Sequence, residues 1–143
     1  MGLPDDDAVA GSLAQCSSSR VVQQLKSQSN LAVLLVNTDR RDEAEPIYRE
    51  VLAARRRTLG EEHADTLRSM HNLARCRYDQ AQAARARCKW LEAATAYHEA
   101  AELGAKLQSR GSDLSSAKAA VQWRNWAETC AERQRRVGTI PVF

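Results

Sequence analysis

The chain has 143 residues, a length that suits one domain. Hydrophobic residues make up 43% of it but aromatic residues only 5%, so we expect closely packed helices with alanine at their contacts and not a core of large rings. The net charge of +3, from 21 basic and 18 acidic residues, describes a mixed, solvated surface and argues against a nucleic-acid-binding protein.

Apolar residues recur at helical spacing through nearly the whole chain, and no stretch shows the alternation of a strand. The predicted fold class is therefore all-α. The pattern predicts five helices, at about residues 18–37, 42–58, 65–86, 91–108 and 114–136. We expect residues 1–17 to form a flexible acidic segment and residues 137–143 a short tail, which leaves one helical domain over residues 18–136.

The tripeptide Asn-Leu-Ala occurs at residues 30–32 and again at residues 72–74, an interval of 42 residues. Such a fixed interval is typical of helical solenoids. In the first unit, Ala44 and Tyr48 follow Ala32 at positions that fit the second helix of a hairpin. Small side chains at the crossing let two antiparallel helices approach closely, and the tyrosine ring fills the wedge beside them.

These residues resemble the tetratricopeptide repeat, in the 42-residue variety found in kinesin light chains and their relatives. The resemblance covers residues 30–67, with the segments Asn30-Leu31-Ala32, Asp42-Glu43-Ala44-Glu45-Pro46-Ile47-Tyr48, Leu59-Gly60 and His63-Ala64-Asp65-Thr66. Ala64 stands where the family usually has proline, and Asp39 where glycine is common; neither forbids the fold. No heptad coiled coil of the kind that joins a light chain to its heavy chain is present, so the resemblance concerns the repeat type only.

The second unit departs from the first by about seven extra residues, at 80–86, which would lengthen its first helix by nearly two turns. Its second helix is taken as residues 89–103, and the alternative alignment starts that helix at Arg77. A third start at residues 125–127 would make the last helix a terminal cap. The packing residues that the resemblance implies are Leu31, Ala32, Ala44, Tyr48, Val51, Leu73, Ala74, Ala93, Tyr97 and Ala100.

The resemblance implies non-catalytic protein–protein interaction, by an adaptor or scaffold that holds a partner peptide or helix in its concave groove. The family places an asparagine near that groove, where the amide can hold the backbone of an extended peptide. The groove residues implied here are Asn30, Val33, Asn37, Asn72 and Arg75. An equally open alternative is that the asparagines only hydrogen-bond between adjacent helices, which is the favoured reading for Asn125.

The second candidate function is a structural or assembly subunit of a larger multiprotein complex, because fewer than three full repeats are marginal in isolation. We expect no enzyme, since His71 and His98 have no nucleophile or carboxylate at a catalytic spacing. His63 falls in the loop motif of the family, where it is structural. We expect no metal and no cofactor, and the expected partners are proteins, with no nucleic acid and no insertion into a membrane.

The N-terminal segment lacks the apolar region of a secretory signal, and no stretch approaches the roughly 18 apolar residues of a membrane span. We therefore expect a cytoplasmic protein, or one bound to an organelle or complex if the chain is processed or truncated. Cys16, Cys76, Cys88 and Cys130 are expected to be buried thiols, with two disulfides as the alternative. The arginine-rich runs at residues 55–57 and 133–136 are expected to complement helix dipoles, with an acidic partner as the alternative.

Overall fold

The computed structural model describes residues 6–110 and 114–138 and contains five α-helices. They are α1 (Asp6–Asn37), α2 (Arg41–Leu59), α3 (Ala64–Ala86), α4 (Trp90–Ser109) and α5 (Leu114–Gly138). No strand occurs within these two ranges, and the predicted all-α helical repeat solenoid is confirmed.

Helix α1 begins at Asp6, well before the predicted helix start near Ser18. No proline interrupts the segment that follows. The last helix also runs to Gly138, two residues beyond the predicted end, and the remainder of the predicted tail lies outside the described residues.

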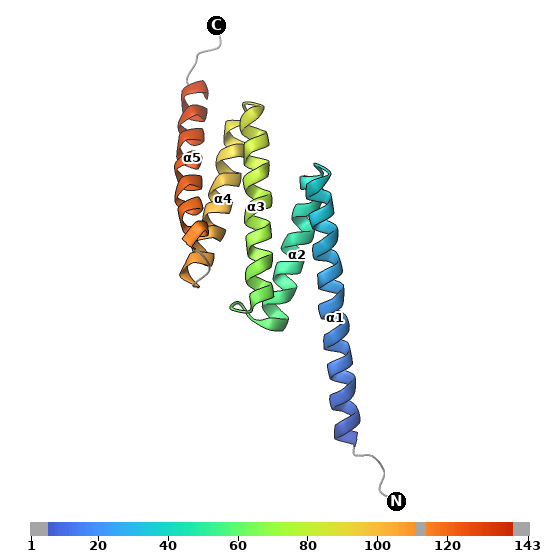
Figure 1. The fold of residues 1–143 in the computed structure, drawn as a ribbon. Coiled ribbons are helices and arrows are strands. Elements are labelled where there is room, and N and C mark those ends of the chain that lie inside the picture. Colours follow the sequence, from blue (N-terminus) through green and yellow to red (C-terminus); the bar gives the residue numbers. More distant parts are fainter. Residues whose placement is uncertain (1–5, 111–113, 139–143) are drawn as a thin grey trace, which may run out of the picture.

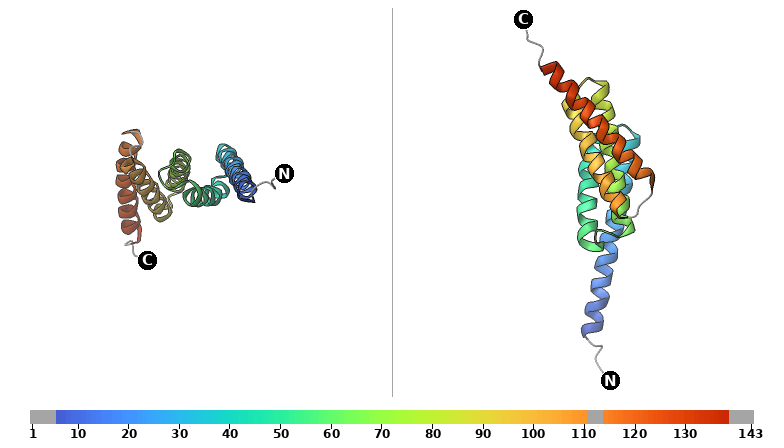
Figure 2. Two further views of the ribbon diagram at one scale, coloured as in Figure 1. Left: turned by 90° about the horizontal axis from the view of Figure 1, so that it is seen from below. Right: turned by 90° about the vertical axis from the view of Figure 1, so that its left-hand side faces the viewer.

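Consecutive helices pack against their neighbours in the chain and form an open row (Figure 1). Seen along the helices, α1 and α3 lie on one side of the row, α2 and α4 on the other, and α5 closes the row against α4 (Figure 2). The helices α1–α2 and α3–α4 are thus two hairpins, followed by one terminal helix. The N-terminal half of α1 extends past the end of α2 as a single helix (Figure 1).

Both hairpins turn through the same backbone motif. Asp39 and Cys88 take left-handed conformations, with φ of 65° and 59°. The next residue in each turn donates its N–H back into the preceding helix, from Arg40 to Leu35 O at 2.8 Å and from Lys89 to Ala84 O at 2.9 Å. Asp39 and Cys88 lie 49 positions apart, seven more than the interval of 42 between the Asn-Leu-Ala tripeptides, which places the seven extra residues within α3.

The loop between the hairpins is closed by His63, which caps α3. Its Nδ1 accepts a hydrogen bond from the Asp65 N–H at 3.1 Å. Ala64 takes the first helical position. The N–H group at this position has no partner within a helix, so alanine fits here as well as the proline that is usual in the family. His63 therefore has the structural role that the sequence predicts.

The first core lies between α1, α2 and α3, with Leu107 of α4 at its edge, and is built around small residues at the helix crossing. Ala32 and Ala44 are completely buried, and the ring of Tyr48 fills the space beside them. Val51 and Ala74 are buried as well. The buried members of this core are Ala32, Ala44, Tyr48, Leu52, Met70, Leu73, Cys76 and Leu107.

Leu31 is an exception among the predicted packing residues, because half of its side chain is exposed. The buried stripe of α1 is formed by Leu25, Ser29 and Ala32, which lie on the side that packs against the rest of the row. Leu31 and Leu34 lie outside this stripe and are largely exposed. The prediction that Leu31 packs within the repeat is therefore wrong.

The second core, between α3, α4 and α5, has mainly alanines among its buried residues, as the composition predicts, and large, partly buried rings pack against them. The ring centroid of Tyr78 lies 5.3 Å from that of Trp123, 5.9 Å from that of Trp126 and 6.0 Å from that of Tyr97. Contacts of this kind contribute about 0.5–1.5 kcal/mol each beyond the burial of their area. Aromatic residues are few in the chain, but four of them gather at this one place.

Helix α3 continues without a break through residues 80–86, so the second helix of this hairpin is α4 and does not start at Arg77. Ala81 on the added turns is completely buried and joins the core that contains Ala93 and Tyr97, both also completely buried, as is Ala100. The extra residues therefore extend the packed interface between α3 and α4.

Helix α5 approaches α4 very closely at Gly104. A Cβ atom at this position would lie 2.9 Å from the Cβ of Ala120 and 3.5 Å from Cζ3 of Trp123. The first distance is too short for two carbon atoms, and the Ala120 Cβ is fixed to the backbone of α5. The position therefore requires glycine for the observed packing of the two helices.

We predict that Gly104→Ala destabilises the protein. Overpacking costs about 1–3 kcal/mol, and this loss should exceed the gain of about 1 kcal/mol from replacing a helical glycine by alanine. Urea unfolding followed by circular dichroism measures the effect. Gly138→Ala is the matched control, because a Cβ there meets no atom within 4 Å. An unfolding midpoint for Gly104→Ala equal to or above that of the control would contradict the prediction.

Candidate functional site

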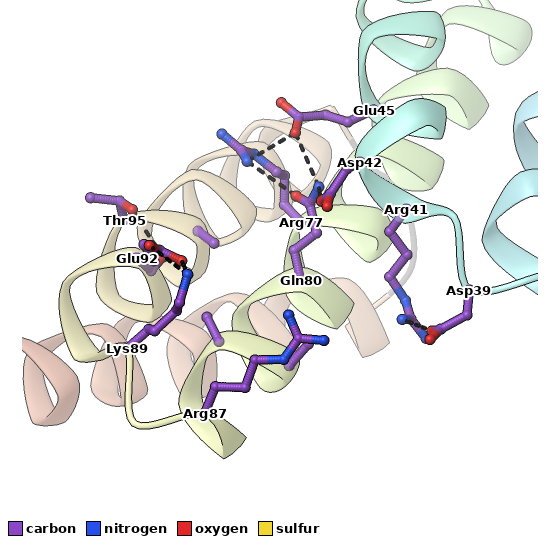
Figure 3. A pocket seen from close by; sticks show the side chains of 13 residues that line it. Asp39, Arg41, Asp42, Glu45, Arg77, Gln80, Arg87, Lys89, Glu92 and Thr95 are labelled. Atoms are coloured by element: carbon purple, nitrogen blue, oxygen red, sulfur yellow. Dashed lines mark hydrogen bonds and ion pairs between the residues drawn. The ribbon is translucent and has the colours of Figure 1, made fainter.

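A polar hollow of about 410 Å³ lies where α2, α3 and α4 meet (Figure 3). Most of its charged side chains are paired with one another. Lys89 Nζ lies 3.1 Å from Glu92 Oε1, and Arg41 pairs with Asp39 across the turn. This hollow therefore offers a partner few free charges, although it is lined almost entirely by polar groups.

Arg77 is the centre of the ion pairs beside this hollow. It reaches Glu45 on α2 at 3.1 Å and Glu99 on α4 at 2.7 Å. Arg49 on α2 pairs with the same two carboxylates, at 2.8 Å each. Gln80 completes the cluster, donating from Nε2 to Glu45 Oε2 at 3.1 Å. The cluster connects both hairpins, and we interpret it as a structural link between them.

Burial raises the pKa of the Glu45 carboxyl, but the hydrogen bonds from Gln80 and Arg49 and the positive charges of Arg77 and Arg49 outweigh it. The net result is a pKa below the ordinary value of 4.5. Glu45 therefore stabilises the folded state through its ionised form.

Two further hollows lie along the line where α3 and α5 meet, and we call them together the α3–α5 groove. The lower hollow, of about 360 Å³, is lined by residues that include His71, Arg75, Tyr78 and Trp123. The upper hollow, of about 590 Å³, is lined by Gln82, Arg85, Ala86, Trp90, Trp126, Thr129, Cys130 and Arg133. The rings of Tyr78, Trp123 and Trp126, where α3 meets α5, lie between them.

The upper hollow combines indole rings with positive charge. The guanidinium of Arg85 lies 6.0 Å from the ring centroid of Trp126, and that of Arg133 lies 5.0 Å from the ring centroid of Trp90. No carboxylate is among the residues that line this hollow, and neither arginine forms an ion pair with a carboxylate whose side chain the structure describes. Gln82 is held by a hydrogen bond from its Nε2 to the Tyr78 hydroxyl at 2.7 Å.

Two buried polar groups belong to the same region. The hydroxyl of Tyr97 is buried and forms no hydrogen bond of normal distance and angle within the described part of the chain. Burial raises the pKa of Tyr97, and hydrogen bonding by the nearby Arg85 side chain and its positive charge oppose this rise. Burial also raises the pKa of the Cys130 thiol, against the charges of Arg85 and Arg133, so this thiol is protonated at neutral pH.

The cysteines differ in their surroundings. Cys76 and Cys130 are buried free thiols, and burial raises the pKa of Cys76 to about 11. Cys88 is also free but exposed, so the prediction that it is buried is wrong. The reason is its place in the turn between α3 and α4, where its side chain has no helix to pack against. The side chain of Cys16 lies outside the described part of the molecule.

The residues predicted to line the binding groove lie on two different helices. Arg75 is exposed on α3 and lines the lower hollow, and Asn72 is half-buried on the same helix. Asn30, Val33 and Asn37 are exposed on α1, at the other end of the row from α5, and are not among the residues that line the α3–α5 groove (Figure 1).

The asparagine side chains do not link adjacent helices in the described structure. Those of Asn30 and Asn72 form no hydrogen bond with another described residue, and Asn125 is exposed on α5. The alternative of a purely interhelical role therefore has no hydrogen bond to support it at Asn30 or Asn72. Whether these amides hold a partner stays a prediction.

Sequence reasoning missed the most distinctive residues of the upper hollow. Trp126, Cys130 and Arg133 on α5 follow one another at helical spacing, and this pattern was the available signal.

The prediction that the arginines at 55–57 complement a helix dipole is wrong for Arg55, which is buried and donates to Ser69 Oγ at 2.6 Å and to the Asp65 carbonyl at 3.0 Å.

No group of three or more histidine, cysteine or acidic side chains that would hold a metal ion occurs among the residues for which the structure gives positions. Within the same residues, no helix combines the length and the apolar character that crossing a bilayer requires. His71 is exposed in the lower hollow, and His98 is exposed beside Glu102 on α4.

Residues 23–88 match the family described as tetratricopeptide repeat. The matched segment runs from within α1 to the turn after α3, so it contains most of the first hairpin and the first helix of the second. Together with the five-helix row, this match supports a tetratricopeptide repeat protein, a class of helical-repeat proteins that generally mediate protein–protein interactions. Comparisons with curated proteins and with solved structures gave no match.

We predict that Glu45→Gln lowers stability at neutral pH by about 1 kcal/mol, because the cluster keeps its geometry but loses a charge. The folded-state pKa of Glu45 lies below 4.5, so its contribution is complete above that pH and is lost as the pH falls through the folded-state value. Urea unfolding at a series of pH values should show a shallower loss below pH 4.5 in the variant than in the parent protein. The exposed Glu50 on the same helix gives the control, Glu50→Gln. Parallel curves of unfolding free energy against pH for all three proteins would contradict a stabilising role of ionised Glu45.

Proposed function

We propose that this protein is a non-catalytic interaction module, an adaptor or scaffold, that binds a segment of a partner protein in the α3–α5 groove. The observation that carries the proposal is the composition of that groove. It holds partly exposed tryptophan rings from α4 and α5 beside arginines that have no carboxylate partner in the described structure. Tryptophan, tyrosine and arginine are the residues that most often dominate the energy of protein interfaces.

The other polar hollow suits this role less well. A partner that binds there would compete with the ion pairs of Arg77, Glu45 and Glu99, which hold the two hairpins together. The α3–α5 groove can be occupied without breaking any ion pair that the structure shows. The rings of Trp123 and Trp126 are fixed by Tyr78, so little side-chain freedom is lost when a partner binds.

The kinesin-light-chain type of repeat is part of this proposal as a repeat type alone. It rests on the residues between Asn30 and Leu67, which keep the family pattern continuously. The second component of the proposal is an asparagine clamp, in which the side-chain amides of Asn30 and Asn72 bind the backbone of the partner peptide. Mutation of these two residues separates this contact from binding in the α3–α5 groove.

We predict that Arg75→Glu weakens capture of the natural partner by about 30-fold, since removal of an interface arginine at a hot spot costs about 2 kcal/mol or more. The partner is first isolated with the parent protein from the source cell, and its affinity for each variant is then measured. Arg68→Glu is the matched control, an exposed arginine on the same helix that does not line the groove. Circular dichroism checks that the variants remain folded.

The double variant Asn30→Ala with Asn72→Ala is measured in the same experiment. If this double variant no longer binds the partner while Arg75→Glu binds it fully, the asparagine amides and not the α3–α5 groove are the binding site. Undiminished binding by both variants would overturn the interaction surface proposed here.

A second candidate function, a subunit embedded in a larger assembly, is favoured by the surface of α1. Five of the large apolar side chains that are most exposed lie on this one helix: Val21, Val22, Leu31, Val33 and Leu34. Leu34 is 61% exposed. These side chains are spread around α1 outside its buried stripe, and exposed apolar side chains gathered on one helix are typical of a site covered by another protein.

If the protein is such a subunit, we predict that Leu31→Gln with Leu34→Gln releases it from the native complex while leaving its helicity unchanged. Size-exclusion chromatography of cell extract measures the complex, and circular dichroism of the purified variant measures the fold. Leu91→Gln, on an equally exposed leucine of α4, is the control. Elution of the parent protein as a free monomer in the extract would exclude this second function.

A further inference from the structure

The upper hollow of the α3–α5 groove holds two positive charges that the rest of the protein leaves uncompensated. The guanidiniums of Arg85 and Arg133 each lie over an indole ring, and no carboxylate lines the hollow. Carboxylates are available on α5, but Glu132 pairs with Arg136 at 2.7 Å and leaves Arg133 free of an ion pair in the described structure. Two cations brought to one hollow without a counterion indicate an anionic ligand.

A third hydrogen-bonding group lies beneath them. The Tyr97 hydroxyl is buried and forms no hydrogen bond of normal distance and angle with a described residue, and the side chain of Arg85, which lines the hollow, is close enough to interact with it. A buried hydroxyl of this kind is costly unless something binds it. Arg85 is exposed, so its side chain can turn aside from the ring of Trp126 and open a path to this hydroxyl.

We propose that the upper hollow binds the phosphate group of a phosphorylated side chain in the partner segment. This inference rests on the proposed function of the groove. Arg85 and Arg133 donate charge-assisted hydrogen bonds to two of the phosphate oxygens, and the Tyr97 hydroxyl donates to the third. The indole rings of Trp90 and Trp126 hold the guanidiniums and contact the apolar part of the bound segment.

The number of donors favours phosphate over carboxylate as the ligand group. A carboxylate has two oxygens, and a phosphate monoester offers three oxygens together with a charge of about −1.5 to −2 at neutral pH. With two arginines and one hydroxyl in place, a carboxylate would leave one donor unpaired. The hollow, at about 590 Å³, also has room for residues that flank the phosphorylated side chain.

The experiment uses three pools of degenerate peptides that differ at one central residue, which is phosphoserine, serine or glutamate. The purified full chain is immobilised, and the retained fraction of each pool is measured. We expect retention of the phosphoserine pool to exceed that of the other two by about tenfold or more. The tryptophan emission of the protein should change on binding, because Arg85 leaves the ring of Trp126.

Three variants test the assignment of the residues. Arg85→Gln and Arg133→Gln should each reduce phosphoserine retention by about tenfold, and Tyr97→Phe should reduce it while keeping the ring contacts of the core. Arg124→Gln is the control, because Arg124 is exposed on α5 and does not line the hollow. Circular dichroism shows whether each variant folds.

Equal retention of the three pools, or of the phosphoserine and glutamate pools, would overturn the phosphate site. Unchanged retention by both arginine variants would overturn it as well. The lower-hollow variant Arg75→Glu separates the two proposals, since it should weaken the natural partner but leave the preference for phosphoserine intact. Loss of that preference in the upper-hollow variants, with no effect of Arg75→Glu on the natural partner, would reject the lower hollow as a partner site and keep the phosphate site.

Discussion

The ring of Tyr78 on α3 contacts Trp123 and Trp126 on α5 and Tyr97 on α4, so one side chain packs against both later helices. The terminal helix would otherwise be held by α4 alone, through small residues such as Gly104 and Ala120. Tyr78 reaches across to α5, and the two hollows of the α3–α5 groove are lined by residues that follow it and precede it along α3, together with residues of α4 and α5.

The two polar regions of the molecule differ in how their charges are satisfied. Beside the hollow between α2, α3 and α4, arginines and glutamates alternate, and each charge of the cluster around Arg77 finds its counterion within the fold. In the upper hollow of the groove, Arg85 and Arg133 are held over rings and have no described carboxylate partner. Paired charges contribute to the link between the hairpins, whereas the unpaired ones remain available to a ligand.

The seven extra residues of α3 connect the irregularity of the repeat with this second region. Residues 80–86 add nearly two turns, and they supply Gln82, Arg85 and Ala86 to the upper hollow. Ala81 on the same turns is buried against α4, so the lengthened helix remains packed and does not project into solvent. A hairpin of regular length would end before this hollow could form.

The sequence by itself determined the helices, the turn at Asp39 and the small residues Ala32 and Ala44 at the first crossing. The helices follow from residue spacing, and the turn and the crossing residues follow from local residue chemistry together with the resemblance to the repeat. Residue spacing shows which side chains share a face of a helix, but it does not show what stands opposite that face. The tertiary structure alone therefore decided that Leu31 is exposed, that Tyr78 meets Trp126 from a distant helix, and that Arg85 has no counterion within the described chain.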